Sequence, residues 1–339
     1  MQKKKYVMFV AAIVVYSSFT IYLYLPYFGK FQRFQYLLVV NLIFAALGCY
    51  ILSRRWVCGF IESLIAGSLY AFGPFTLSLV RYHPTAGLLA ASIPWLFFPA
   101  AFGPKNRPLW LNILSVAIPF MAIVLFFQVT IHFRLFAIPT QARVEPEETY
   151  SFIAPLVAAR QGTTLIGFYH VPIAALIMGM ALLITAKRYG IITIIAVGLI
   201  LTFCNGVNSF LEVSPIIWLT ISTLCCSIII GVGLQGFVSA GFADRKWILA
   251  SSIVMGSLAI VTLLLATKYF QIIFGLGSGY ALLFTKEAKM YILGTVAAAI
   301  IFFLSCAKLR MHLLREAVLF AATALDIFLG ARFIIDRIF

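Results

Sequence analysis

The sequence predicts an all-α protein, a polytopic transmembrane helix bundle with about eleven spanning helices. Hydrophobic residues make up 63% of the 339 residues and charged residues only 10%, whereas a soluble domain carries about 25% charged residues. Apolar runs of about 20 residues recur along the whole chain, and this length crosses a hydrocarbon core of about 30 Å. Basic residues stand in the short turns between alternate runs. The positive-inside rule therefore predicts a cytoplasmic N-terminus.

The stretch Trp56–Gly103 sets the orientation of the other helices. Its two apolar runs meet at the polar sequence Arg81–Pro84. Arg54-Arg55 precedes the first run, and Lys105 and Arg107 follow the second. Because basic residues favour the cytoplasmic side, the sequence predicts a transmembrane hairpin whose tip faces away from the cytoplasm.

Three further helices complete the N-terminal half. The first apolar run follows Lys3–Lys5 and is too long for the apolar region of a signal peptide, so we interpret it as a retained helix. Pro94 and Pro99 lie in the second helix of the hairpin and should kink it, because proline removes a backbone hydrogen bond. The predicted spans of this half are Tyr6–Phe28, Phe34–Ser53, the two runs of Trp56–Gly103, and Leu109–Phe133.

The C-terminal half begins after the longest polar interval, an outer loop at about 134–164 that carries a possible amphipathic helix at Thr149–Arg160. The sequences Asn205-Gly206 and Gly231–Gly236 are candidate helix breaks. The partly apolar segment Lys268–Met290 is expected on the outer side of the membrane. The last helix contains several charged residues, so it either spans or lies in the interface. The predicted spans are Leu165–Ala186, Ile191–Asn205, Ile216–Val238, Trp247–Thr267, Tyr291–Ala307 and Ala317–Ile335. We expect residues 1–339 to form a single integral membrane domain.

The net charge of +15 indicates membrane lipids as partners and not nucleic acid. The basic residues lie in short loops, where anionic lipid headgroups attract them, and no basic stripe carries the interleaved aromatics of a strand-binding surface. We expect no cofactor and no metal, because the histidines stand near predicted helix ends without a C-x-x-C-H motif or a metal-ligand spacing. The predicted location is a bacterial cytoplasmic (inner) membrane.

Polar side chains gather on the predicted outer face. Arginine and histidine there could bind a lipid phosphate, with a carboxylate as base. The alternative is that outer loops simply hold the polar residues that cannot lie in the membrane. The candidate catalytic residues are His83, Glu147, Glu148, His170 and Glu212, and the candidate lipid-phosphate-binding residues are Arg81, Arg134 and Arg160.

Two acidic residues fall inside predicted spans, where a charge is costly and often functional. Glu62 lies near the cytoplasmic end of its helix and could pair with Arg54 or Arg55. Asp326 could pair with Arg332 or with a neighbouring helix. We interpret both as intramembrane polar contacts.

Several short runs resemble a known family. The sequences Ala66–Phe72, His83-Pro84 and Ile93–Leu96 (IPWL) are similar to the early helices of YfhO-type membrane proteins, within the wider type C glycosyltransferase-like superfamily. The run from Glu212 through Gly231–Gly236 resembles the later core helices of that family. The resemblance implies a transferase-like helical fold whose relatives use polyprenyl-phosphate sugars at the outer face.

The first outer loop departs from that family. In the family this loop is long and carries an acidic catalytic residue or pair, but here it is only about Gly29–Arg33 and contains no acidic residue. We therefore predict an integral membrane subunit of a larger assembly, with other membrane proteins as partners and without evident catalytic residues. The alternatives are a lipid-linked sugar transferase acting at the outer face, and a transporter or flippase.

Overall fold

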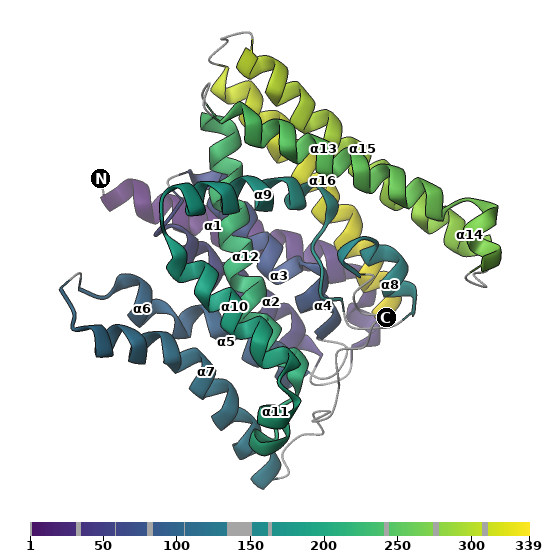
Figure 1. Ribbon diagram of the computed structural model, residues 1–339. Coiled ribbons are helices and arrows are strands. Elements are labelled where there is room, and N and C mark those ends of the chain that lie inside the picture. The colour runs from purple at the N-terminus through teal and green to yellow at the C-terminus, as the bar shows by residue number, and fades with distance from the viewer. Residues whose placement is uncertain are drawn as a thin grey trace. The chain divides into compact units, whose positions relative to one another are not determined.

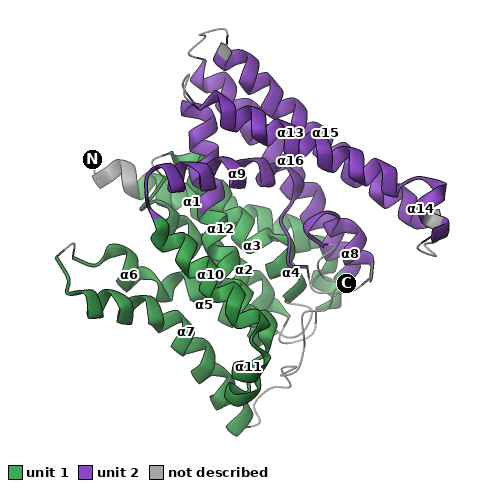
Figure 2. Cartoon of the chain, viewed as in Figure 1, with its two compact units in different colours: residues 1–145, 189–228, 338–339 green, residues 146–188, 229–337 purple. Residues whose placement is uncertain are grey.

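The computed structural model confirms an all-α integral membrane protein. It describes residues 2–31, 35–57, 59–79, 84–104, 106–133, 151–161, 165–240, 244–273, 278–306 and 311–339, and all regular elements in these ranges are helices. Nine helical segments among them are long and apolar enough to span a membrane, or ten if one bent pair forms a single span. The chain divides into two compact units, which are coloured in Figure 2.

Unit 1 comprises residues 1–145, 189–228 and 338–339. Its helix α2 packs between α3 and α5, and side chains join these helices through buried carbonyl groups. The Tyr16 hydroxyl donates a hydrogen bond to the Leu64 carbonyl oxygen at 2.8 Å. The helices of this unit are α1 (Gln2–Tyr24), η1 (Leu25–Lys30), α2 (Tyr36–Ser53), α3 (Phe60–Phe72), α4 (Pro74–Leu79), α5 (Pro84–Leu96), α6 (Phe98–Phe102), α7 (Leu109–His132), α10 (Tyr189–Phe203), α11 (Asn205–Leu211), η3 (Pro215–Trp218) and the first part of α12 (Leu219–Ser239).

Two consecutive helices of unit 1 meet at a sharp bend beside the glycine that the sequence marked as a candidate break. Helices α10 and α11 meet at Cys204 with a bend of 79°. Asn208 stabilises the bend, because its Nδ2 donates to the Leu201 carbonyl oxygen and its Oδ1 accepts from Trp218 Nε1, both at 2.8 Å. The amide thus satisfies a carbonyl and an indole that the bend brings together.

We expect Asn208→Leu to lower the free energy of unfolding by about 1 kcal/mol, because two hydrogen bonds are lost and the Trp218 indole stays buried. The measurement is the thermal-unfolding midpoint in a mild detergent. Thr193→Val is the matched control, since it removes only an exposed bond within the same unit, from Thr193 to the Tyr189 carbonyl. Equal midpoints for the two variants would contradict a stabilising role for Asn208.

Unit 2 comprises residues 146–188 and 229–337. Helices α13 and α15 form a long antiparallel hairpin through α14, and α9 packs against both of them (Figure 1). Glycines let α9 approach α12 closely, because a Cβ on Gly233 would overlap the Ala175 carbonyl oxygen. The helices of this unit are α8 (Pro155–Gln161), α9 (His170–Thr185), the rest of α12, α13 (Arg245–Leu265), α14 (Lys268–Ile273), α15 (Ser278–Cys306) and α16 (His312–Ile338).

Helices α15 and α9 differ from their predicted extents, and α12 lacks a candidate break. Helix α15 begins at Ser278, well before the predicted start at Tyr291. It continues through charged residues because they divide between faces: Glu287 is buried, whereas Lys286 and Lys289 are exposed. Helix α9 has only 16 residues, and α12 runs unbroken through Gly231–Gly236, where the glycines allow close packing and do not break the helix.

Candidate functional site

A cluster of three ionisable side chains lies buried in unit 2. His170 begins α9, Glu287 lies in α15 and Asp326 lies in α16, and each is exposed by no more than 1%. His170 Nδ1 is 2.8 Å from Asp326 Oδ1, and His170 Nε2 contacts Glu287 Oε2. The imidazole therefore joins two carboxylates from two different helices.

The second oxygen of each carboxylate caps a helix N-terminus. Asp326 Oδ2 accepts the backbone N–H of Val171 at 2.6 Å, at the start of α9. Glu287 Oε1 accepts the N–H groups of Leu156 and Val157 at 2.5 and 3.3 Å, at the start of α8. The first N–H groups of a helix have no partner within the helix, and leaving them unsatisfied away from water is costly. The cluster removes that cost for both helices.

The geometry requires a proton between the imidazole and each carboxylate. A neutral imidazole has one N–H donor and one bare nitrogen, and a bare nitrogen facing an ionised carboxylate would bring two lone pairs together. Both His170 nitrogens face carboxylate oxygens, so either the ring carries both protons or one carboxyl group holds the second. In either form the cluster as a whole carries one excess negative charge.

Tyr291 fixes the plane of the imidazole ring. Its own ring meets that of His170 edge to face, with the centroids 4.7 Å apart and the planes at 88°. The Tyr291 hydroxyl donates to the Ile153 carbonyl oxygen at 2.8 Å. Helix α15 thus orients His170 through Tyr291 and also bonds it through Glu287.

A cavity of about 280 Å³ adjoins the cluster, within unit 2. Its inner wall is formed by buried residues, including His170 and Asp326, and its mouth by the exposed residues Lys286, Lys289 and Leu329. The cavity therefore combines apolar walls with cationic groups at the mouth. The complete lining is Leu156, His170, Lys286, Lys289, Met290, Asp326, Leu329, Gly330 and Phe333.

Among the residues that the sequence singled out, His170 and Asp326 lie together in this cluster. Asp326 bonds to α9, one of the two kinds of partner considered for it. Arg160 lies on α8, with its guanidinium 4.7 Å from the ring centre of Tyr280, and does not line the cavity.

The other sequence-selected residues lie elsewhere. Glu62 is buried in the first turn of α3, in unit 1. Glu212 also belongs to unit 1, where it is exposed after α11 with a positive φ of 51°. The remaining candidates lie outside the described residues: His83, Glu147, Glu148, Arg81 and Arg134.

The sequence interpretation missed Glu287 and the two lysines beside the cavity. It assigned them to the partly apolar outer segment Lys268–Met290. A signal was present nevertheless: Leu283, Glu287 and Tyr291 recur every four residues, which places Glu287 on the same helix face as two apolar residues. All three side chains are buried.

The two carboxylates approach opposite nitrogens of His170, and in the described part of the chain no three metal-ligating side chains converge on one point. Comparison with known protein families, with characterised proteins and with solved structures finds no match for this chain.

Proposed function

We propose that this chain is a lipid-binding subunit of a membrane assembly, in a bacterial cytoplasmic membrane. The observation that carries the proposal is the apolar-walled cavity whose mouth includes Leu329, a residue 45% exposed on a helix long and apolar enough to span a membrane. An exposed side chain on a spanning helix faces lipid. A cavity whose mouth includes such a side chain can therefore be entered sideways by a membrane lipid. The short Lys- and Arg-rich loops support the cytoplasmic membrane as the location.

The buried cluster favours binding over catalysis. A general base needs a free lone pair within reach of the substrate proton, but both nitrogens of His170 are engaged by carboxylates. The second oxygen of each carboxylate accepts a hydrogen bond from a backbone N–H group. The cluster is therefore better suited to form a rigid wall of a ligand-binding cavity than to transfer a proton. The sugar-transferase and transporter alternatives remain predictions from the sequence.

We expect lipid to remain bound when the protein is purified in a mild detergent and the co-purifying lipids and proteins are measured by mass spectrometry. Leu329→Trp should lower the bound lipid severalfold, because the indole would fill the cavity mouth. Leu325→Trp is the matched control: Leu325 is 46% exposed one turn earlier on α16 and does not line the cavity.

The outcomes separate the two parts of the proposal. Loss of lipid from the Leu329 variant alone supports lipid binding in the cavity, and equal lipid content in both variants contradicts it. Stoichiometric co-purification of another membrane protein supports the role as a subunit, and recovery of the chain without any protein partner contradicts that role.

A further inference from the structure

We propose that the cavity beside His170 binds the headgroup of an anionic membrane phospholipid, with Lys286 and Lys289 holding the phosphate. The inference rests on the proposed lipid-binding function and adds the charge class of the lipid and the residues that select it.

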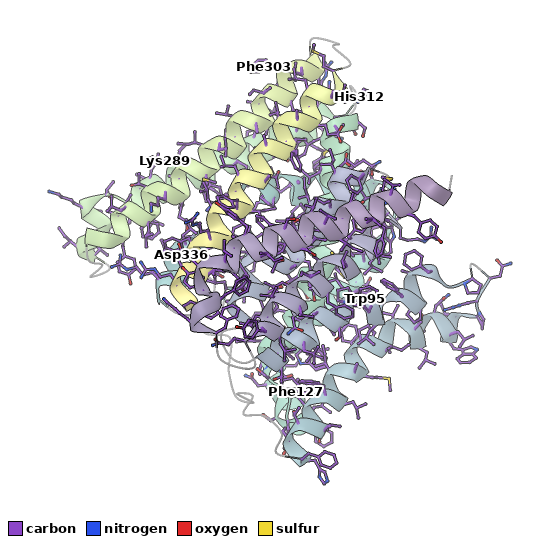
Figure 3. The ribbon with its side chains drawn as sticks, turned by 180° about the vertical axis from the view of Figure 1, so that it is seen from behind. Trp95, Phe127, Lys289, Phe303, His312 and Asp336 are labelled. Atoms are coloured by element: carbon purple, nitrogen blue, oxygen red, sulfur yellow. The ribbon has the colours of Figure 1, made fainter. Side chains whose placement is uncertain are left out.

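The two lysines are placed to act together. They stand three residues apart on α15, so they share one helix face, and both are exposed at the cavity mouth. Figure 3 shows Lys289 part of the way along α15, away from Phe303 and His312. Across the ranges that the structure describes, neither Lys286 nor Lys289 forms an ion pair within 4.0 Å.

The carboxylates of the buried cluster do not neutralise these lysines. Asp326 lines the cavity, but its two oxygens already accept hydrogen bonds from His170 and from the Val171 N–H. The cluster as a whole carries one excess negative charge, whereas the two lysines carry one positive charge each. The cavity lining therefore has a net positive charge, and an anion would complete it.

The apolar part of the lining selects a lipid over a water-soluble anion. Leu329 is exposed at the mouth, and Met290 and Phe333 are half-buried beside the lysines. Lys286 Nζ lies 5.9 Å from the centre of the Phe333 ring. If this ammonium bound the phosphate of a lipid, the lipid carbons next to that phosphate would lie against the ring. A small hydrated anion would lose water to these walls without an apolar contact in return.

The size of the cavity decides how much of the lipid it can hold. Its volume of about 280 Å³ lies just below the range of about 300–1,000 Å³ that is usual for ligand pockets. It can enclose a headgroup and the first chain carbons, whereas two complete acyl chains must stay in the bilayer. Lys286 and Lys289 lie just before the uncharged stretch 290–306 of α15, and their long side chains can reach toward the headgroup level.

The test compares short-chain ligands with the full-length protein in a mild detergent. Dihexanoyl phosphatidylglycerol is the anionic probe, dihexanoyl phosphatidylcholine has the same chains with a zwitterionic headgroup, and sodium phosphate lacks the chains. Affinities are measured by native mass spectrometry. We expect the anionic probe to bind more tightly than the other two.

The double variant Lys286→Gln/Lys289→Gln should weaken binding of the anionic probe by about fivefold per lysine, which corresponds to about 1 kcal/mol for each cation near an anionic headgroup. The matched control is Lys246→Gln/Lys268→Gln. It removes the same charge from two other exposed lysines of unit 2 that do not line the cavity, and it should leave affinity unchanged.

Several results would overturn the inference. Equal affinity for the zwitterionic probe would contradict selectivity for an anionic headgroup, while lipid binding, and thus the proposed function, would stand. Equal affinity for sodium phosphate would leave an anion site without a lipid. An equal loss in both lysine pairs would indicate a general effect of charge, and no loss in the Lys286/Lys289 variant would remove these residues from the site. If the wild-type protein binds none of the probes and retains no lipid on purification, the proposed function fails as well.

Discussion

His170→Leu is expected to destabilise the protein more than any other single change considered, by about 3–5 kcal/mol, the usual cost of removing one partner from a buried ion pair. The substitution leaves Glu287 and Asp326 buried without the imidazole that both contact. Each carboxylate must then either keep an uncompensated charge or take up a proton. The measurement is the thermal-unfolding midpoint in a mild detergent.

Glu287→Gln is the informative companion variant. The Gln carbonyl can still accept the N–H groups at the start of α8, and its amide can donate to a neutral His170 ring, which has a free nitrogen. We therefore expect a much smaller loss of stability than for His170→Leu. Equal destabilisation of the two variants would show that the imidazole shared by the two carboxyl groups is not what stabilises the cluster.

Gly233→Ala should have the second-largest effect, a loss of about 2–3 kcal/mol, near the upper end of what overpacking usually costs. An added Cβ would overlap the Ala175 carbonyl oxygen, and two backbones cannot move apart without separating α9 from α12. Close backbone approach at small residues is a main source of helix association within membranes. The expected observation is a lower unfolding midpoint, with the helix content retained below it.

Gly256→Ala provides the matched control on α13. There the nearest atom to an added Cβ is Thr295 Cγ2 at 3.8 Å, which is ordinary contact. Alanine is favoured over glycine inside a helix by about 0.8–1.0 kcal/mol, so this variant should be as stable as the wild type or slightly more stable. Destabilisation of the Gly256 variant to the same extent would show that the Gly233 effect does not come from the close approach of α9 and α12.

Both predictions concern unit 2, and they explain why polar and small residues recur among its apolar helices. Lipid offers no hydrophobic drive for one helix to join another. The capped N-termini of α8 and α9 and the close contact of α9 with α12 supply the specific contacts instead. A cavity with cationic and apolar walls can be held at a fixed geometry only if such contacts hold the helices around it.

The sequence by itself determined the all-α membrane architecture, because long apolar runs have few other stable arrangements. It also identified Asp326 and His170 as polar residues of interest, and the bend near Asn205-Gly206. The apolar runs, the polar residues among them and the glycine beside the bend are all visible in short stretches of sequence, so they could be inferred from local composition alone.

Only the tertiary structure decided which polar residues meet. Glu287 and Asp326 each lie more than a hundred positions after His170 in the sequence. They also belong to two different helices, α15 and α16. Their meeting depends on how the α13–α15 hairpin and α16 pack against α9, which apolar periodicity does not specify because lipid-facing and helix-facing residues are equally hydrophobic. The sequence interpretation placed Lys286–Lys289 in an outer segment, whereas in the structure α15 continues through them and Glu287 contacts His170.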